Sequence, residues 1–286
     1  RMDKIWLKNY PAGVPHEVHP EQYRSAAHMI EDAMRQHAGR PFSVCMEQWM
    51  GYAELDRQSA ALGAWLQGQG LAPGARVAIM LPNIPQFAVT MAAVLRAGYI
   101  CVNVNPLYTG RELEHQLKDS GSSAIVILEN FAHTLAEVIE HTGVQRVVMA
   151  SMGDLLGFWY GRWITFAVRH LAKMVPAYDL PLSAGRTLVT FRQALSDGAR
   201  RTLTASSATL DDTAFLQYTG GTTGLSKGAV LTHRNIVAAT LQAEAWFTPA
   251  LAKMGDVTKA NSIAALPLYH IFALTLCLLA IRQGSH

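Results

Sequence analysis

The sequence is poor in charged residues and in cysteine. Only 16% of its 286 residues are charged, and the 24 basic residues nearly balance the 21 acidic ones, which gives a net charge of +3. Such a balance predicts no nucleic-acid partner, because surfaces that bind nucleic acids are usually strongly basic. The cysteines are Cys45, Cys101 and Cys277, and no CxxC pair occurs. These spacings argue against a zinc ribbon and a disulfide framework and indicate a reducing, cytoplasmic setting.

The sequence also lacks a recognisable export signal. The opening residues Arg1-Met2-Asp3-Lys4-Ile5-Trp6 contain no apolar segment of the kind that signal peptides have. Half of all residues are hydrophobic. This proportion excludes a disordered chain, and the length is that of one large α/β domain or of two smaller ones.

One uncharged stretch, residues 260–281, is long enough to span a bilayer. Pro267 and His270 interrupt its middle, and both are unfavourable near the centre of a bilayer. In place of a transmembrane helix we therefore predict a buried strand at 262–266, a loop, and a buried helix at 271–281.

Apolar runs of strand length alternate with segments of helical period between residues 26 and 150. The predicted helices are 26–37, 54–69, 86–96, 111–120 and 132–142, and the predicted strands are 76–81, 99–103, 124–128 and 144–150. This alternation predicts an α/β fold in which helices cover a parallel or mixed sheet.

The segment 155–176 breaks that rhythm. It is rich in aromatic residues, and no acidic residue occurs between Asp154 and Asp179. On a helix, one face would carry Arg162, Phe166, Arg169 and Lys173, and the broadly opposite face Trp163, Ile164, Ala167, Leu171, Met174 and Val175. Two interpretations stay open: a helix that lies in a membrane interface, and a helix that packs on its own domain with its arginines in water.

Glycine, threonine and lysine are concentrated in the run Tyr218-Thr219-Gly220-Gly221-Thr222-Thr223-Gly224-Leu225-Ser226-Lys227-Gly228. Glycines let backbone N–H groups approach an anion, threonine hydroxyls add donors or a metal ligand, and lysine adds positive charge. Such a loop suits a triphosphate. A Walker A loop is disfavoured, because serine precedes the lysine, glycine follows it, and strands are predicted on both sides, at 214–218 and 229–231.

This loop resembles the phosphate loop of the adenylate-forming, AMP-binding enzymes, a superfamily that includes the acyl-CoA synthetases. The resemblance continues in Leu231-Thr232-His233-Arg234-Asn235, where a helix is predicted over 232–246. It includes Leu266-Pro267-Leu268-Tyr269-His270-Ile271-Phe272, which is similar to the motif that borders the acyl pocket. Residues 6–13, 103–109, 111–117 and 174–181 resemble the bacterial long-chain fatty-acid–CoA ligases specifically.

The resemblance implies the N-terminal part of the large domain of an adenylate-forming enzyme. It divides the chain into an N-terminal α/β subdomain at 1–195, with a candidate membrane-surface segment at 155–176, a small polar linker at 196–212, and the truncated start of an ATP-binding subdomain at 213–286. The implied activity converts long-chain fatty acids to acyl-CoA through an acyl-adenylate, with release of AMP and pyrophosphate. ATP, Mg²⁺ and coenzyme A are the implied cofactors and co-substrates.

The resemblance also implies roles for individual residues. The implied ATP-binding residues are Tyr218, Thr219, Gly220, Gly221, Thr222, Thr223, Gly224, Leu225, Ser226, Lys227, Gly228 and Ala229. Thr219 is the implied Mg²⁺ ligand, and Lys227 would offset phosphate charge as a catalytic residue. Tyr269 and His270 would bind the substrate where the fatty-acid carboxylate meets its pocket, with His270 as the second catalytic residue. Without the surrounding motif, His270 would be interpreted as a structural core histidine.

Other groups of polar residues are weaker candidates. His16 and His19 lack a third ligand and are predicted to lie on the surface. Glu112, Glu114 and His115 are predicted to form a solvated face of a helix.

Several segments of the family do not occur in this sequence: the Tyr-Gly-x-Thr-Glu segment, the ribose-binding aspartate, the hinge and the C-terminal lysine. We therefore expect an N-terminal portion that is inactive alone and binds ATP weakly. Two alternatives stay open: another adenylate-forming ligase, for aryl or medium-chain acids, and a non-catalytic membrane-surface module. A homodimer and peripheral contact with the cytoplasmic side of the inner membrane are further candidate associations.

Overall fold

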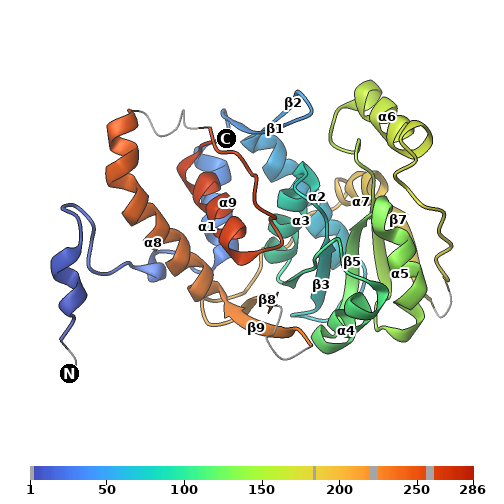
Figure 1. Ribbon diagram of the computed structural model, residues 1–286, viewed down its shortest axis with the longest axis horizontal. Helices are drawn as coiled ribbons and strands as arrows, with labels where there is room; N and C mark the ends of the chain where they lie inside the picture. The colour runs from blue at the N-terminus through green and yellow to red at the C-terminus, as the bar shows by residue number, and fades with distance from the viewer. Residues whose placement is uncertain (1–2, 183–184, 220–224, 256–260) are drawn as a thin grey trace.

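A mixed sheet of seven strands forms the centre of the protein (Figure 1). The computed structural model describes residues 3–182, 185–219, 225–255 and 261–286. Across the sheet the strands follow the order β7 (Thr187–Thr190), β6 (Arg146–Ala150), β5 (Ser122–Leu128), β3 (Arg76–Met80), β4 (Ile100–Asn103), β8 (Thr213–Thr219) and β9 (Lys227–Thr232). All neighbours are parallel except β8 and β9, which are antiparallel.

Successive residues of β3 contribute to two different hydrophobic cores. Val77 and Ile79 belong to one core, and Ala78 and Met80 belong to the other. All four side chains are completely buried. Both faces of a parallel sheet are normally covered in this way, which is why β3 is a continuous apolar run in the sequence rather than an alternating one.

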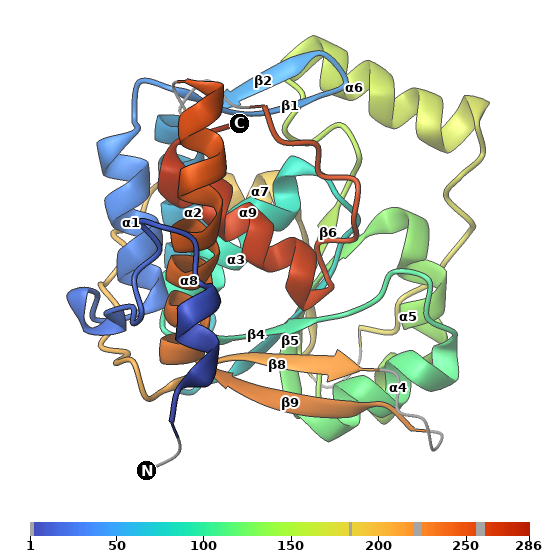
Figure 2. The ribbon, with the colours of Figure 1, turned by 60° about the vertical axis from the view of Figure 1, so that its left-hand side comes forward.

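Helices cover both faces of the sheet (Figure 2). The larger core includes residues of α1 (Ala26–Gln36), α2 (Tyr52–Gln67), α3 (Pro85–Arg96), α7 (Phe191–Gly198), α8 (His233–Leu251) and α9 (Ile271–Gln283). The smaller core includes residues of α4 (Gly110–Ser120) and α5 (Ala132–Val138). The predicted α/β fold, with helices over a mixed sheet, is therefore confirmed.

Most of the predicted elements are present with small shifts at their ends. The largest shift is in the predicted helix 232–246, because α8 continues to Leu251. In the predicted helix 132–142, α5 ends at Val138 and a 3₁₀ turn, η4 (Ile139–His141), completes the segment. The predicted strand pair 214–218 and 229–231 forms the β8–β9 hairpin, and the predicted helix 271–281 is α9.

The predicted strand at 262–266 is wrong. These residues form no strand, and their side chains are exposed. Their backbone carbonyl groups at Ala264 and Leu266 instead accept hydrogen bonds from the side chain of Asn83. The apolar run 262–266 predicted a buried strand, but these residues are exposed in the structure.

Two hairpin strands escaped prediction, β1 (Pro41–Cys45) and β2 (Gln48–Gly51), which pair antiparallel. Their turn is made by Met46 and Glu47, both with positive φ, at 47° and 63°. Such turns usually contain glycine or asparagine, so the sequence gives no turn signal at this point.

The region between the two predicted subdomains contains more structure than a linker. α7 extends to Gly198, within the predicted linker 196–212, and residues 199–212 contain no helix or strand. β8 then pairs in parallel with β4. The segment after the linker therefore continues the same sheet, and the division into two subdomains stays a prediction.

No helix among the described residues combines the length and the apolar character that a bilayer crossing requires. The longest apolar helix of the uncharged stretch, α9, has 13 residues and lies in the larger core.

We expect Gly198→Ala to destabilise the protein. A Cβ at this position would lie 1.9 Å from the carbonyl oxygen of Ala61 in α2. Alanine normally favours a helix, but this overlap should lower the free energy of unfolding by about 1–3 kcal/mol. Urea denaturation measures the change. Gly39→Ala is the matched control, because its Cβ would meet nothing within 4 Å; an equal effect of the two substitutions would contradict the packing argument.

Candidate functional site

The β8–β9 hairpin carries the glycine- and threonine-rich motif at one end of the sheet. Thr219, the last residue of β8, pairs with Lys227, the first residue of β9. Both side chains are exposed, as is that of Leu225. Five of the predicted ATP-binding residues, Gly220, Gly221, Thr222, Thr223 and Gly224, lie outside the described residues.

Helix α4 supports the hairpin from one side. The ring of His115 contacts the carbonyl oxygen of Ser226 through Nε2 at 2.9 Å. The Tyr218 hydroxyl donates to Asp119 Oδ2 at 2.6 Å. Burial and then this hydrogen bond raise the pKa of the Tyr218 hydroxyl, so it stays protonated and remains a donor. The predicted solvated face of α4 thus includes one residue, His115, that instead contacts the motif.

Gly228 is required by the packing of the Tyr218 ring. A Cβ at Gly228 would lie 2.9 Å from the ring carbon Cζ of Tyr218, a distance at which a neighbour must move. The small residue that follows Lys227 therefore lets the aromatic ring cover the start of β9. In the sequence, this glycine was interpreted only as part of a phosphate loop.

A chain of buried amide side chains connects α4 to the loop before α9. Gln116 Nε2 donates to the carbonyl oxygen of Asn103 at 2.8 Å. Asn103 Nδ2 donates to Gln217 Oε1 at 3.2 Å, and Gln217 Nε2 donates to the carbonyl oxygen of Tyr269 at 2.9 Å. All three amides are buried. The hairpin strand β8 and the Tyr269–His270 motif are therefore fixed relative to each other by hydrogen bonds.

Asn83 holds the other end of this loop. It follows β3, and its Nδ2 donates to the carbonyl oxygens of Ala264 and Leu266 at 2.7 and 2.8 Å. Its Oδ1 accepts the backbone N–H of Leu268 at 2.9 Å. In the sequence, Asn83 lies just after the predicted strand 76–81 and is not a candidate site residue. Its role was missed because the three hydrogen bonds join residues more than 180 positions apart.

These polar residues collect at the carboxyl ends of parallel strands. Asn83 follows β3, Asn103 ends β4, and Thr219 ends β8. Ligands of open α/β sheets bind at this edge. The arrangement therefore brings the hairpin motif and the Leu266–Phe272 motif, which are separate in the sequence, to one edge of the sheet.

His270 caps helix α9. Its Nδ1 accepts the backbone N–H of Phe272 at 3.4 Å, and the side chain is exposed. Tyr269, its neighbour, is partly buried. His270 therefore does not lie in the core, as the alternative interpretation has it, but its bond to the Phe272 backbone is a structural contact.

A largely apolar cavity of about 750 Å³ lies behind this loop. Its volume is within the range of small-molecule sites, about 300–1,000 Å³. Its lining includes Asn83, Leu268 and residues of β1 and β2. Helix α9 contributes Ala273, Leu276, Cys277, Leu279, Ala280 and Gln283 to the lining.

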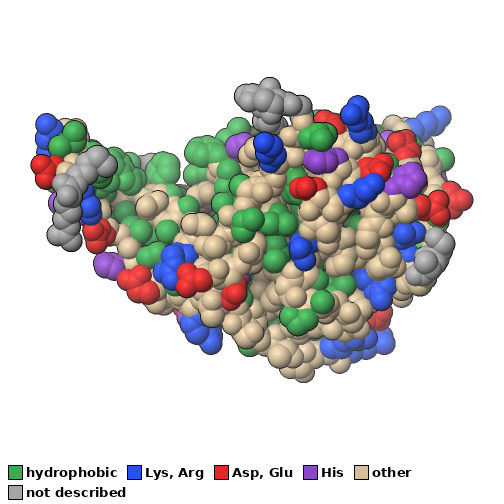
Figure 3. All heavy atoms as spheres, turned by 90° about the horizontal axis from the view of Figure 1, so that it is seen from below, with side chains coloured by type: hydrophobic (Ala, Val, Ile, Leu, Met, Phe, Trp, Pro, Cys, Tyr) green, Lys and Arg blue, Asp and Glu red, His purple; other side chains and the backbone are tan. Residues whose placement is uncertain are grey.

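Charges around the hairpin end of the molecule are mixed. On the face seen from below in Figure 3, basic and acidic side chains are interspersed rather than segregated. In the part of the chain that the structure describes, no three His, Cys, Asp or Glu side chains come together as a metal-binding group. His16 and His19 are exposed, as predicted. A metal at the hairpin would depend on hard oxygen donors such as the exposed Thr219 hydroxyl together with the oxygens of a bound phosphate.

His233, in the motif that follows the hairpin, has a structural role. Its Nδ1 accepts the backbone N–H of Ala26 at 3.2 Å, which joins the start of α8 to the start of α1. Thr232 and Asn235 form a capping box for α8. Burial lowers the pKa of His233 to about 4.

Comparison with known proteins identifies the family. The sequence profile of the AMP-binding enzymes matches residues 30–286. The chain belongs to the AMP-binding enzyme family. Among curated relatives of this family, a long-chain-fatty-acid–CoA ligase of Escherichia coli O157:H7 is 48% identical over 99% of this chain and 49% of its own length. One of Bacillus subtilis is 32% identical over 95% of this chain and 47% of its own length.

The chain spans about half the length of the curated relatives it matches. Solved structures of CoA ligases share its fold. A long-chain-fatty-acid–CoA ligase of Archaeoglobus fulgidus superimposes with a TM-score of 0.72 at 23% identity, over 97% of this chain and 48% of that one. An anthranilate CoA ligase in complex with anthranoyl-AMP superimposes with a TM-score of 0.69 at 16% identity, over 94% of this chain and 46% of that one.

We expect Asn83→Ala to loosen the loop before α9. The substitution removes the acceptor for the Leu268 N–H and two donors to the loop. Because a hydrogen bond contributes roughly 1 kcal/mol, loss of the three bonds should accelerate exchange of the Leu268 amide by at least about tenfold. Hydrogen–deuterium exchange of peptides covering 262–272 measures this.

The control for this experiment is Asn105→Ala. Asn105 Oδ1 accepts only a local hydrogen bond, from the Leu107 N–H at 3.0 Å. Unchanged exchange of the Leu268 amide in Asn83→Ala, or equal acceleration in both variants, would contradict the proposed anchor.

Stability should fall in acid because of His233. The unfolded residue titrates near 6.5, whereas the folded residue titrates at about 4, so below pH 6.5 the unfolded state binds more protons. The free energy of unfolding should therefore fall as the pH drops from about 6.5 to about 4, by on the order of 2–3 kcal/mol from this group. His233→Gln keeps an acceptor but does not titrate. Urea denaturation across this pH range should show a flatter profile for the variant, and identical profiles would refute the assignment.

Proposed function

We propose that the protein containing this chain activates long-chain fatty acids to acyl-CoA at the expense of ATP. The observation that carries the proposal is the common edge of the sheet, where the Gly/Thr/Lys hairpin and the end of an apolar cavity are held together by Asn83, Asn103 and Gln217. The names of the similar curated ligases support the same activity.

The proposed reaction has two balanced steps. The carboxylate oxygen of the fatty acid attacks the α-phosphorus of ATP, which forms acyl-AMP and releases pyrophosphate. The thiol sulfur of coenzyme A then attacks the acyl carbon, the bond to AMP breaks, and acyl-CoA is formed. The first step brings two anions together, so catalysis depends mainly on charge neutralisation and alignment.

The hairpin suits the phosphate end of this reaction. Residues Tyr218 to Ala229 would surround the β- and γ-phosphates. The Lys227 ammonium group is exposed at the first position of β9, opposite Thr219 on β8, so both side chains are available to a ligand at the hairpin tip. Thr219 would supply a hydroxyl to Mg²⁺, whose charge would offset that of the phosphates.

The Tyr269–His270 loop suits the carboxylate end. His270 is exposed at the N-terminus of α9, a position where a helix favours negative charge. Tyr269 is tied by its carbonyl oxygen to Gln217 of β8. The apolar cavity behind the loop would take the alkyl chain, with α9 as one wall.

Two other functions remain as alternatives. A ligase for aryl or medium-chain acids would use the same chemistry, with an aryl or medium-chain acid in place of a long-chain fatty acid in the cavity. A non-catalytic module would leave the hairpin without a ligand, although Lys227 and Thr219 are retained there. A homodimer and an inner-membrane location stay predictions.

The test is ATP–pyrophosphate exchange by the complete protein that contains this chain, measured across a panel of fatty and aromatic acids. We expect exchange that depends on long-chain acids. Lys227→Ala should lower it on the order of ten- to a hundredfold, because a charge-assisted contact contributes roughly 1.5–3 kcal/mol. Lys8→Ala removes an exposed lysine in η1 (Ile5–Asn9) and is the matched control.

Each other outcome has a definite meaning. Exchange only with aromatic or medium-chain acids would keep the chemistry and change the substrate. An unaffected Lys227→Ala variant would remove the proposed role of this lysine. Absence of exchange with every acid would refute the proposed function and favour the non-catalytic module.

A further inference from the structure

Helix α6 (Phe158–Phe166) turns its smallest residue toward the protein. Gly161 is its only buried residue. A Cβ at Gly161 would lie 2.1 Å from the carbonyl oxygen of Gly153, and a Cβ at Gly153 would lie 1.8 Å from that of Gly161. The two backbones thus meet at a glycine–glycine contact, which fixes the orientation of the helix about its axis.

The large aromatic residues of α6 point into solvent as a result. The exposed fractions are 60% for Phe158, 80% for Trp159, 56% for Trp163 and 47% for Phe166. Trp163 stacks on Phe166, which the prediction placed on the opposite face, so the predicted separation of the two faces does not hold for this pair. Helices of globular proteins normally bury such side chains, so this face is unusual for a surface in contact with water alone.

The exposed rings are arranged by contacts among themselves. The guanidinium group of Arg162 lies 5.6 Å from the ring centre of Phe158. Trp163 and Phe166 are stacked with 5.9 Å between ring centres. We call Phe158, Trp159, Arg162, Trp163 and Phe166 the aromatic face of α6.

The charge around the aromatic face is positive. Arg162 and Lys173 lie along the segment, and so does Arg169, although Glu129 balances its charge. No acidic residue occurs between Asp154 and Asp179. The nearby acids are neutralised: Asp154 Oδ1 pairs with Arg192 at 3.0 Å, and Glu129, only 1% exposed, pairs with Arg169.

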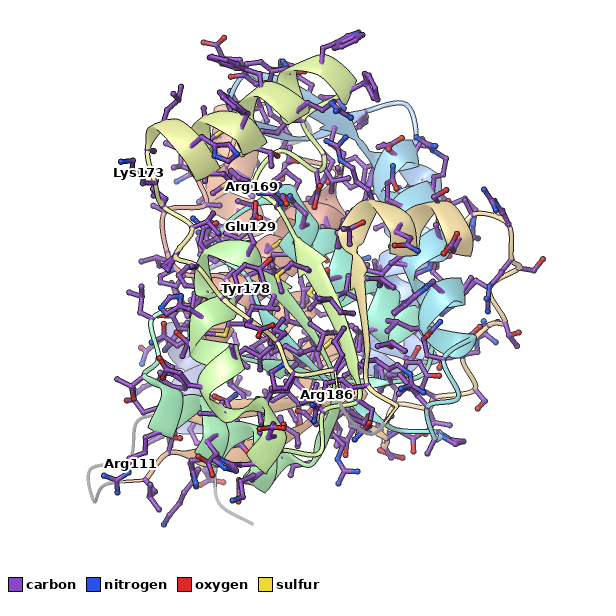
Figure 4. The ribbon with its side chains drawn as sticks, turned by 90° about the vertical axis from the view of Figure 1, so that its right-hand side faces the viewer. Arg111, Glu129, Arg169, Lys173, Tyr178 and Arg186 are labelled. Carbon is purple, nitrogen blue, oxygen red and sulfur yellow. The ribbon has the colours of Figure 1, made fainter. Side chains whose placement is uncertain are left out.

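The segment is held firmly in this orientation. Arg169, in the π-helical turn η5 (Ala167–Leu171) that continues α6, donates from Nε to Glu129 Oε2 at 2.7 Å. Asn130 Nδ2 donates to the carbonyl oxygen of Met174 at 3.0 Å. Figure 4 shows Arg169 beside Glu129, with Lys173 at the end of the same helical segment. These partly buried contacts oppose a rotation that would hide the aromatic residues.

We propose that the aromatic face of α6 binds an anionic phospholipid surface, with the helix lying in the headgroup layer. Tryptophan and phenylalanine favour the interface between headgroups and acyl chains, and each nearby Lys or Arg gains from the negative surface potential. The β1–β2 hairpin lies at the same end of the molecule (Figures 1 and 2) and exposes Val44, Met46 and Trp49. The contact area can therefore extend beyond the helix.

The test is flotation with vesicles of the complete protein that contains this chain, in the absence of nucleotide and acyl substrate, so that it is independent of the proposed ligase activity. We expect binding to vesicles of phosphatidylglycerol and phosphatidylethanolamine, weak binding to phosphatidylcholine alone, and loss of binding at high salt because of screening. Failure to bind the anionic vesicles would overturn the proposal.

Matched variants separate the two contributions. Arg162→Glu with Lys173→Glu should weaken binding on the order of tenfold or more. Arg111→Glu is the control and should leave binding unchanged, because Arg111 is an exposed residue of α4 at the other end of the molecule (Figure 4). Trp159→Ala with Trp163→Ala should weaken binding similarly, whereas Trp6→Ala, in η1 and 47% exposed, should not. Equal losses in the controls would overturn the proposal.

Self-association is the competing use of this face. Sedimentation equilibrium of the same variants distinguishes it. A dimer that Trp159→Ala with Trp163→Ala dissociates, without vesicle binding by the unsubstituted chain, would overturn the proposal in favour of a protein interface. Unchanged thermal midpoints of the variants, which are expected for exposed positions, exclude unfolding as the cause of any loss.

Discussion

Parallel strands at the centre of this protein must be covered on both faces, and this constraint organises the rest of the molecule. β3, β4 and β5 direct alternate side chains into two cores, so helices have to return across both sides of the sheet. Every parallel strand then ends at the same edge. The polar residues that follow the strands, Asn83, Asn103 and Thr219, meet there without any further requirement on the sequence between them.

The buried amides convert this common edge into a defined geometry. A buried polar side chain that loses its partner is costly, by about 1–3 kcal/mol. It is therefore energetically unfavourable to break the hydrogen bonds that join Gln116, Asn103, Gln217 and the Tyr269 carbonyl group. A displacement of the Tyr269 loop would leave the buried Gln217 side chain of β8 without its acceptor. The two motifs of the candidate site should therefore move together or not at all.

Elements with a periodic core pattern could be predicted from the sequence, and those that depend on distant partners could not. The runs that became β3, α3, β4 and β5 are long and apolar, and burial decides their conformation. The segment 262–266 is equally apolar, but the Asn83 side chain donates hydrogen bonds to two of its carbonyl oxygens, and no strand forms. The sequence likewise identified the residues of α6 but not the face they would present, because the contact between Gly153 and Gly161 depends on the tertiary fold.

The candidate site shows the same division. The hairpin was recognisable because its glycines, threonines and lysine are adjacent in the sequence, and the antiparallel pairing of β8 and β9 agrees with that expectation. The supporting residues His115, Asp119 and Asn83 carry no local signal, since each acts on a residue at least 99 positions away. His233 is part of a motif with a functional association, yet its buried contact with Ala26 is a structural one.

The position of β9 has a consequence for assembly. β9 is the last strand of the sheet within the described ranges, so the side away from β8 is an open edge with backbone donors and acceptors facing outward. Edges of this kind are templates for strand addition. Val230, 61% exposed, favours such pairing, whereas Lys227 and Gly228 disfavour it at the end nearest the hairpin tip. A strand added to this edge would lie directly beside the candidate phosphate site.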